Sequence, residues 1–222
     1  VGRSPLGIGV NTSNGDVFVA NSLDDNLTVY DSGNNFITTI EGVGQRPVSL
    51  AYHPTNERMY VVTSDSNRVI TVDTHLYSPL TTIDVGLNPY PIAFNSHNNY
   101  IYVGNRSDDT YSVIGDDDSL LATLSLGAVN IGFAIHPIEN ILFSADTASN
   151  AIAIIGYGAE SSSISIDGEY LQKREDFQHN PGLVKHAKFV LSGQSRFKVL
   201  FLVEKTVSGM FRRRAVSFSN YE

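Results

Sequence analysis

Two runs of acidic residues are the densest groups of potential metal ligands in the chain. Asp24 and Asp25 are adjacent, and Asp116, Asp117 and Asp118 form a run of three. A calcium-binding loop places oxygen ligands at alternating positions around a glycine that allows a sharp turn. These acids are consecutive, and neither run contains a glycine. We therefore interpret them as solvated turn residues, and the sequence predicts neither a metal site nor another cofactor.

Two of the six histidines, His53 and His136, stand at matching places before a proline. The corresponding residues elsewhere are Asn11 and Asn95. A position that accepts His or Asn calls for a side chain that forms hydrogen bonds within a turn. We therefore interpret these histidines as turn residues. The chain contains no HExxH motif and no Gly-x-Ser-x-Gly motif, so it is not predicted to be an enzyme.

One basic run, Arg212, Arg213 and Arg214, could bind an acidic partner. In a strand, Arg212 and Arg214 would share one face and Arg213 would point to the other. Nucleic-acid binding needs a broader basic surface with aromatic stacking positions. We interpret the run as part of a subunit contact, and nucleic acid is not an expected partner.

The elements that must position these residues repeat along the chain. Three prolines lie 42 residues apart, and each follows a glycine by three positions: Pro5 with Gly2, Pro47 with Gly44 and Pro89 with Gly86. Behind each proline the same order of apolar stretches and polar turns recurs. A repeat near 40 residues with several short strands is typical of a β-propeller blade.

The second repeat shows the strands most clearly. Its expected strands are residues 47–52, 58–62, 69–73 and 80–85, rich in Val, Ile, Thr and Tyr and separated by turn residues. The predicted fold is all-β, with four four-stranded antiparallel blades at residues 1–43, 44–85, 86–126 and 127–168. In the fourth blade, Asn130 replaces the proline and residues 163–168 supply the last strand.

These units resemble the YVTN-type β-propeller repeat family. The matching stretches are the second strands (17–21, 59–64 and 101–105), the third strands (27–31 and 69–73) and the exit from Thr82 to Pro89. The resemblance covers about three quarters of the chain and excludes its last part. It implies a propeller of the kind found in surface-layer, envelope and other extracellular proteins, generally without catalysis.

The number of blades is low for such a propeller, because rings close with four to eight blades and members of this family usually have more than four. Blades preceding Val1 could complete the ring, or residues 169–222 could supply strands. Alternatively, two chains could join half-rings and so protect their sheet edges. We favour an incomplete ring or completion between chains over a closed ring of four blades.

The charge divides the chain after residue 168. Residues 1–168 hold five Arg, no Lys and 18 acids (5 − 18 = −13), whereas residues 169–222 hold ten basic and five acidic residues (10 − 5 = +5). We interpret this change as a domain boundary. Three strands are expected in the second part, at 184–191, 196–205 and 210–219. Because 54 residues barely build a core alone, this segment should dock on the propeller or on another subunit.

The docking residues should be apolar and basic side chains of this segment. The strand at 196–205 is largely apolar on both faces, which indicates a central or doubly buried strand. The expected interface residues are Lys185, Lys188, Phe197, Phe201, Arg212, Arg213 and Arg214. In addition, residues 180–190 resemble segments near the ends of tailed-phage virion proteins, which implies that the propeller decorates a virion and this segment attaches it.

Two functions therefore remain open. The first is a non-enzymatic structural protein of an extracellular assembly on a virion or cell surface, homo-oligomeric and bound to other protein subunits. The second is a propeller that binds a ligand or host glycan in adhesion, or, less favoured, a propeller-based hydrolase. The absence of cysteine excludes disulfides, and no stretch reaches the ~18 apolar residues that membrane insertion requires.

Overall fold

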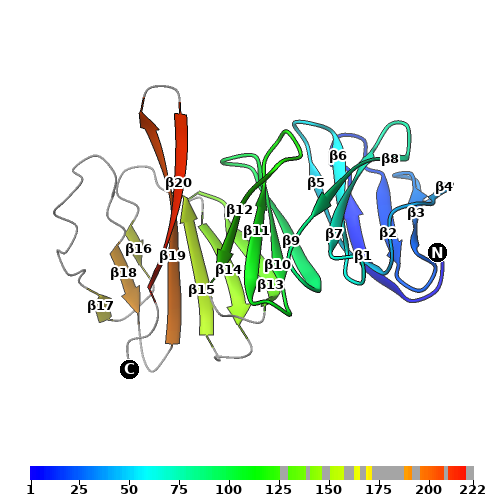
Figure 1. Ribbon diagram of the computed structural model, residues 1–222. Coiled ribbons are helices and arrows are strands. Elements are labelled where there is room, and N and C mark those ends of the chain that lie inside the picture. Colours follow the sequence, from blue (N-terminus) through cyan, green and yellow to red (C-terminus); the bar gives the residue numbers. More distant parts are fainter. Residues whose placement is uncertain are drawn as a thin grey trace. The chain divides into compact units, whose positions relative to one another are not determined.

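The protein is all-β in the part of the chain that the structure describes. The computed structural model describes residues 1–125, 130–138, 141–146, 151–157, 163–165, 169–171, 188–191, 196–207 and 210–218. Within these ranges there are twenty strands and no helix (Figure 1).

The first three repeats each form one four-stranded antiparallel sheet with its strands in sequence order. The first sheet contains β1 (Pro5–Val10), β2 (Val17–Asn21), β3 (Asn26–Tyr30) and β4 (Phe36–Ile40). The second contains β5 (Pro47–His53), β6 (Arg58–Thr63), β7 (Arg68–Asp73) and β8 (Ser78–Asp84). The third contains β9 (Pro89–Asn95), β10 (Tyr100–Asn105), β11 (Thr110–Ile114) and β12 (Leu120–Ser125). The predicted repeat and its strands are confirmed in these three sheets.

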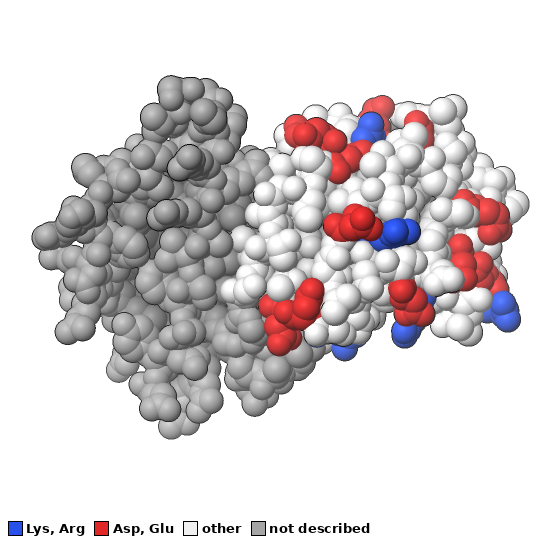
Figure 2. All heavy atoms as spheres, in the orientation of Figure 1, with Lys and Arg blue, Asp and Glu red and all other residues white. Residues whose placement is uncertain are grey.

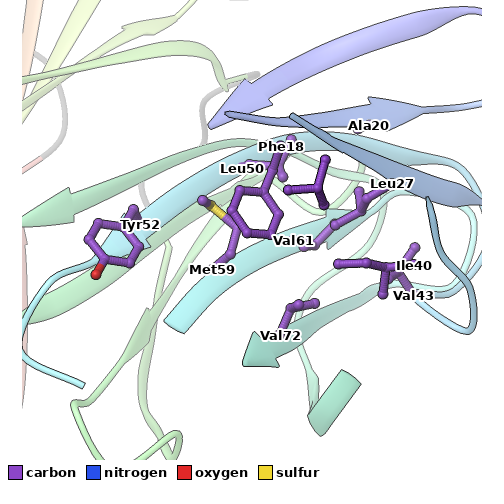
Figure 3. Close-up of a cluster of buried hydrophobic side chains, with 11 residues drawn as sticks. Phe18, Ala20, Leu27, Ile40, Val43, Leu50, Tyr52, Met59, Val61 and Val72 are labelled. Atoms are coloured by element: carbon purple, nitrogen blue, oxygen red, sulfur yellow. The ribbon is translucent and has the colours of Figure 1, made fainter. Parts of the chain in front are cut away.

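The three sheets stack face to face, with β1 against β5 and β5 against β9 (Figure 1). Between the first two sheets lies a core of eleven buried side chains (Figure 3). The first sheet contributes Phe18, Ala20, Leu27, Val29 and Ile40, with Val43 from the loop after it; the second contributes Leu50, Tyr52, Met59, Val61 and Val72. Burial of apolar surface at about 25 cal/mol per Å² therefore stabilises the contact between sheets as well as each sheet.

A second core of the same kind lies between the second and third sheets. It includes Tyr60, Val62 and Val69 from one side and Ile101, Val103 and Ile114 from the other. Strands β5, β6 and β7 of the second sheet thus alternate between the two cores, as the pleat of a strand requires. Met59 and Val61 face the first sheet, whereas Tyr60 and Val62 face the third.

The glycine of the repeat is required by a close approach. In the first repeat, Gly2 lies over Asn21, whose Oδ1 accepts a hydrogen bond from the Gly2 amide at 2.9 Å. A Cβ at Gly2 would lie 2.5 Å from an Asp24 carboxylate oxygen and 2.9 Å from Asn21 Cγ. The residue before each repeated proline has a positive φ of about 50° (Ser4, Arg46 and Asn88), so the whole Gly-x-x-Pro entry repeats in conformation.

The fourth sheet differs from the prediction. Its strand order is β13 (Asn130–His136), β14 (Ile141–Asp146), β15 (Ala151–Tyr157), β19 (Arg196–Val207) and β20 (Met210–Phe218). The predicted last strand of this blade, β16 (Ser163–Ser165), instead pairs with β18 (Lys188–Leu191) in a small sheet that also holds β17 (Glu169–Leu171). The physical reason is strand length, because the twelve residues of β19 offer β15 seven parallel pairs and β16 has only three residues.

The chain divides into two compact units, Val1–Phe133 and Ala134–Glu222, and the division falls inside β13. The boundary inferred from charge, after residue 168, remains a prediction. The central position of β19, between β15 and β20, agrees with the apolar character expected on both of its faces.

Candidate interaction surface

The first sheet has one apolar face that is exposed. Along β1, Gly7 and Gly9 point to the second sheet, where a Cβ at Gly9 would lie 2.7 Å from Met59 Sδ. The alternate side chains point the other way, and Ile8 is 67% exposed and Val10 45% exposed. Val10 pairs with Val17 on β2, and Val17 pairs with Tyr30 on β3, so these two half-buried side chains lie on the same face. We call Ile8, Val10, Val17 and Tyr30 the open face.

The equivalent positions in the next two sheets are covered. Residues 42 positions after the open face are Leu50, Tyr52, Met59 and Val72, and each lies in the core against the first sheet. Residues 84 positions after it are Ile92, Phe94, Ile101 and Ile114, and these lie in or against the core between the second and third sheets. The open face is therefore made of positions that the second and third repeats bury against a preceding sheet.

A shallow groove of about 250 Å³ lies partly on the open face. It is lined by Val1, Gly2, Asn21, Asn26, Thr28, Tyr30, Phe36 and Thr39. Tyr30 and Phe36 meet edge to face, with ring centroids 6.1 Å apart. The Asn21 amide donates to Asn26 Oδ1 at 2.8 Å and to Thr28 Oγ1 at 2.7 Å, so these polar groups already bind one another.

The acids of the inter-strand loops hold backbone amides. Asp25 Oδ1 accepts from the Arg46 amide at 2.8 Å, and this bond joins the first sheet to the entry of the second. Asp24 accepts from the Arg3 amide at 2.6 Å and also pairs with the Arg3 guanidinium at 2.5 Å. The bond from the Arg3 amide, followed by the bond from its side chain, lowers the pKa of Asp24. Asp24 and Asp25 lie in a turn, as predicted, and their solvent-accessible carboxylates also bind backbone amides.

Serine hydroxyls form a second, repeated link between sheets. Ser22 Oγ donates to the Pro47 carbonyl, and Ser64 Oγ donates to the Pro89 carbonyl at 2.8 Å. The third repeat has Arg106 at this position, and its guanidinium lies 4.9 Å from the centre of the Tyr90 ring.

The other acidic run contains a buried carboxylate. Asp118 forms an ion pair with Arg58, and Asp118 Oδ1 accepts from the Tyr60 hydroxyl at 2.5 Å. Burial, followed by this hydrogen bond, raises the pKa of Tyr60 well above its ordinary value. The expectation of solvation is therefore wrong for Asp118, which joins the third sheet to the second. Between the first two sheets, the Tyr77 hydroxyl donates to Asp16 Oδ2 at 2.7 Å, and this bond, with burial, raises the pKa of Tyr77 to about 12.

The repeated His or Asn position forms the turn bonds that were predicted. His53 Nδ1 accepts from the Asn56 amide at 3.4 Å, which leaves the proton on Nε2 to donate to the Asn99 carbonyl at 3.0 Å. Asn11 and Asn95 accept in the same way from amides two residues later, both through Oδ1. Burial lowers the pKa of His53. No group of three potential metal ligands occurs among the described residues.

The predicted docking residues lie in different sheets. Lys188 is in β18, Phe197 and Phe201 are in β19, and the arginine run is in β20; Lys185 lies outside the described residues. Opposite the run on β19, Arg212 pairs in register with Lys205, Arg213 with Glu204 and Arg214 with Val203. The structure thus brings Phe197, Phe201 and the arginines into one sheet, and it places Lys188 in another.

The open face was not found from the sequence. Its signal was present in the 42-residue register, since Ile8 and Val10 align with Leu50 and Tyr52. What the sequence does not show is that no sheet in the described part of the chain covers these two positions.

Acidic side chains outnumber basic ones on the visible face of the described part (Figure 2). Among the described residues, no helix is long and apolar enough to cross a membrane.

The fold defines a class of all-β proteins built from successive four-stranded antiparallel sheets, and 1164 chains of solved structures are similar to this chain. No family model and no curated protein matches it. One similar structure is Kuenenia stuttgartiensis hydrazine synthase, with a TM-score of 0.63 and 19% sequence identity. The similarity covers 70% of this chain and 47% of that one, so this chain spans about half the length of its neighbour. At this identity the likeness concerns the fold, which is propeller-like in the neighbour.

Proposed function

We propose that this chain is a non-enzymatic structural protein of an extracellular surface assembly, on a virion or a cell envelope. Its four repeats form blades of a β-propeller of the YVTN type that is displayed outward. Residues 169–222 attach the propeller to other protein subunits and favour a homo-oligomer. The weaker likeness of residues 180–190 to tailed-phage virion proteins supports the virion as the site of attachment.

One observation carries this proposal: the two buried carboxylates among the described residues, Asp16 and Asp118, are used to join sheets. Asp118 is bound by Arg58 and Tyr60, and Asp16 is bound by Tyr77. A catalytic carboxylate would instead need to reach a substrate in a cleft. The open face of the first sheet is apolar and exposed, which suits contact with protein.

The charge of the two parts supports attachment through the second part. Residues 1–168 carry −13 and residues 169–222 carry +5, so the second part of one chain attracts the blades of another. Its arginine run lies on β20, next to the long strand β19.

The groove beside Tyr30 and Phe36 favours a second function, glycan binding in adhesion. The aromatic pair offers a stacking surface for a sugar, and the exposed Thr39 hydroxyl in the same groove offers a hydrogen-bonding group. Thermal shift of the full chain against a glycan panel tests this function. A shift that Tyr30→Ala abolishes and Tyr77→Phe retains would favour glycan binding, and no shift with any glycan would count against it.

The surface role is tested on intact cells or particles that carry the protein. Antibodies raised against residues 1–125 should label the intact surface, whereas antibodies against residues 196–218 should label only after disruption. Labelling by neither antibody before disruption would contradict the outward display of the blades. Turnover of ester, glycoside or phosphate substrates by the purified chain would contradict a non-enzymatic role.

A further inference from the structure

The contact between successive sheets is one interface that recurs along the chain, and the first three sheets show it twice. The covering side is the face of the first sheet that carries Phe18 and Ala20, and its equivalent on the second sheet carries Tyr60 and Val62. The covered side carries the equivalents of the open face, such as Leu50 in the second sheet and Ile92 in the third. The open face is the equivalent side of the first sheet, but its side chains are exposed.

The fourth sheet offers a further side of the covering kind. Phe143 and Ala145 on β14 lie 125 residues after Phe18 and Ala20, which is two repeats of 42 and one of 41. Phe143 is half-buried and Ala145 is exposed. An aromatic residue followed at the second position by a small one is the pattern that covers Leu50 and Tyr52 in the first interface.

We propose that the open face of one chain docks the β14 face of a second copy, so that Phe143 and Ala145 cover Ile8 and Val10. This inference rests on the proposed function and goes beyond it, because it adds a contact between copies that lies outside residues 169–222. The interface is head-to-tail, because two different surfaces of the chain meet in it. Two copies joined at both ends would carry eight such sheets, within the four to eight that close propellers.

Two single substitutions test the two sides separately in the full chain. Ile8→Glu places a charge on the open face, and Ala145→Glu places one on the β14 face; both positions are exposed, so the fold should tolerate them. Leu76→Glu is the matched control, since Leu76 is 75% exposed and lies outside both faces. Light scattering coupled to size exclusion gives the mass, and far-UV circular dichroism checks the fold.

The wild type and Leu76→Glu should have a mass close to twice the 24.2 kDa of one chain. Each of the other two variants should be monomeric, with a dissociation constant at least about 100-fold weaker, because each buries an unpaired charge. An equimolar mixture of Ile8→Glu and Ala145→Glu should recover dimers, since one intact open face can meet one intact β14 face.

Three results would overturn the proposal. A monomeric wild type would indicate that the open face is free or is covered within the chain. Dimers that Ile8→Glu leaves intact would place the contact elsewhere. Loss of dimers in Ile8→Glu alone, with no recovery on mixing, would indicate that two open faces meet each other. All three concern the purified chain, so surface labelling by antibodies can succeed or fail independently of them.

Discussion

Removal of the Asp118 carboxylate should destabilise the first unit far more than removal of an exposed carboxylate. Asp118→Ala leaves the Tyr60 hydroxyl and the Arg58 guanidinium without their anionic partner. The side chain of Asp118 is 5% exposed, whereas that of Arg58 is 33% exposed. The lost hydrogen bond of Tyr60 therefore contributes most of the destabilisation, because water can replace the carboxylate at Arg58 but reaches the buried phenol less easily.

The magnitude follows from these two contacts. A hydrogen bond to a charged group contributes about 1.5–3 kcal/mol when it is buried. The partly exposed ion pair adds less than about 1 kcal/mol, in the range of surface pairs. The free energy of unfolding should therefore fall by about 2–4 kcal/mol, which lowers the melting temperature by about 5–15 °C for a chain of this size.

Urea denaturation followed by tyrosine fluorescence measures this change. The matched control is Asp84→Ala, which removes an exposed pair with Arg68 at 2.9 Å and should cost less than about 1 kcal/mol. Tyr60→Phe in the Asp118→Ala background should restore part of the loss, because it removes a hydroxyl that still accepts from Asn56 but whose proton has lost its acceptor. The reasoning is refuted if Asp118→Ala costs no more than Asp84→Ala, or if the two changes at Asp118 and Tyr60 are additive.

Three further predictions concern the same unit. Burial holds the pKa of His53 below 6.5, so the unfolded chain binds the proton first and stability falls as the pH drops below about 6.5; His53→Asn should flatten this fall between pH 7 and 5 in denaturant titrations, and an unchanged slope would contradict it. Gly9→Ala should cost about 1–3 kcal/mol in melting experiments, because its Cβ would meet Met59 Sδ, whereas Gly132→Ala, with open space around it, should cost much less; equal losses would refute this. Tyr77→Phe should cost about 1 kcal/mol at pH 7. Because the folded pKa of Tyr77 is raised to about 12, this difference should shrink as the pH rises from about 10 to 12; a constant difference would argue against the bond.

The sequence predicted the first three sheets because their strands are local and repeated. Val, Ile and Tyr alternate between Gly- and Pro-containing turns, and each strand pairs with its neighbour in sequence. The turn role of His53 was predictable for the same reason, since Asn stands at the equivalent position in two other repeats.

The fourth sheet was not predictable in this way. The pairing of β15 with β19 joins residues more than 40 positions apart in parallel, and no short-range signal marks such a partner. The repeat pattern also favoured residues 163–168 as the strand next to β15, although β16 has only three residues.

The candidate surface was only partly predictable for a related reason. Strand alternation shows that Ile8 and Val10 share a face, but exposure depends on which sheet covers them. The burial of Asp118 was missed because consecutive acids in a turn are usually solvated, and its partners Arg58 and Tyr60 lie about 60 residues away in the sequence.

The serine hydrogen bonds between sheets affect the order in which parts of this protein unfold locally. The second sheet is bonded to both of its neighbours. Ser22 donates to Pro47 at the start of β5, and Ser64 donates to Pro89 at the start of β9 in the third sheet. A sheet at the end of such an array can open while its neighbours stay folded, but the second sheet cannot open without exposing two cores. Strand β6, with Met59 in one core and Tyr60 in the other, should therefore exchange its amide hydrogens most slowly. Local unfolding should begin at β4, the edge strand of the first sheet, and proceed toward the second sheet.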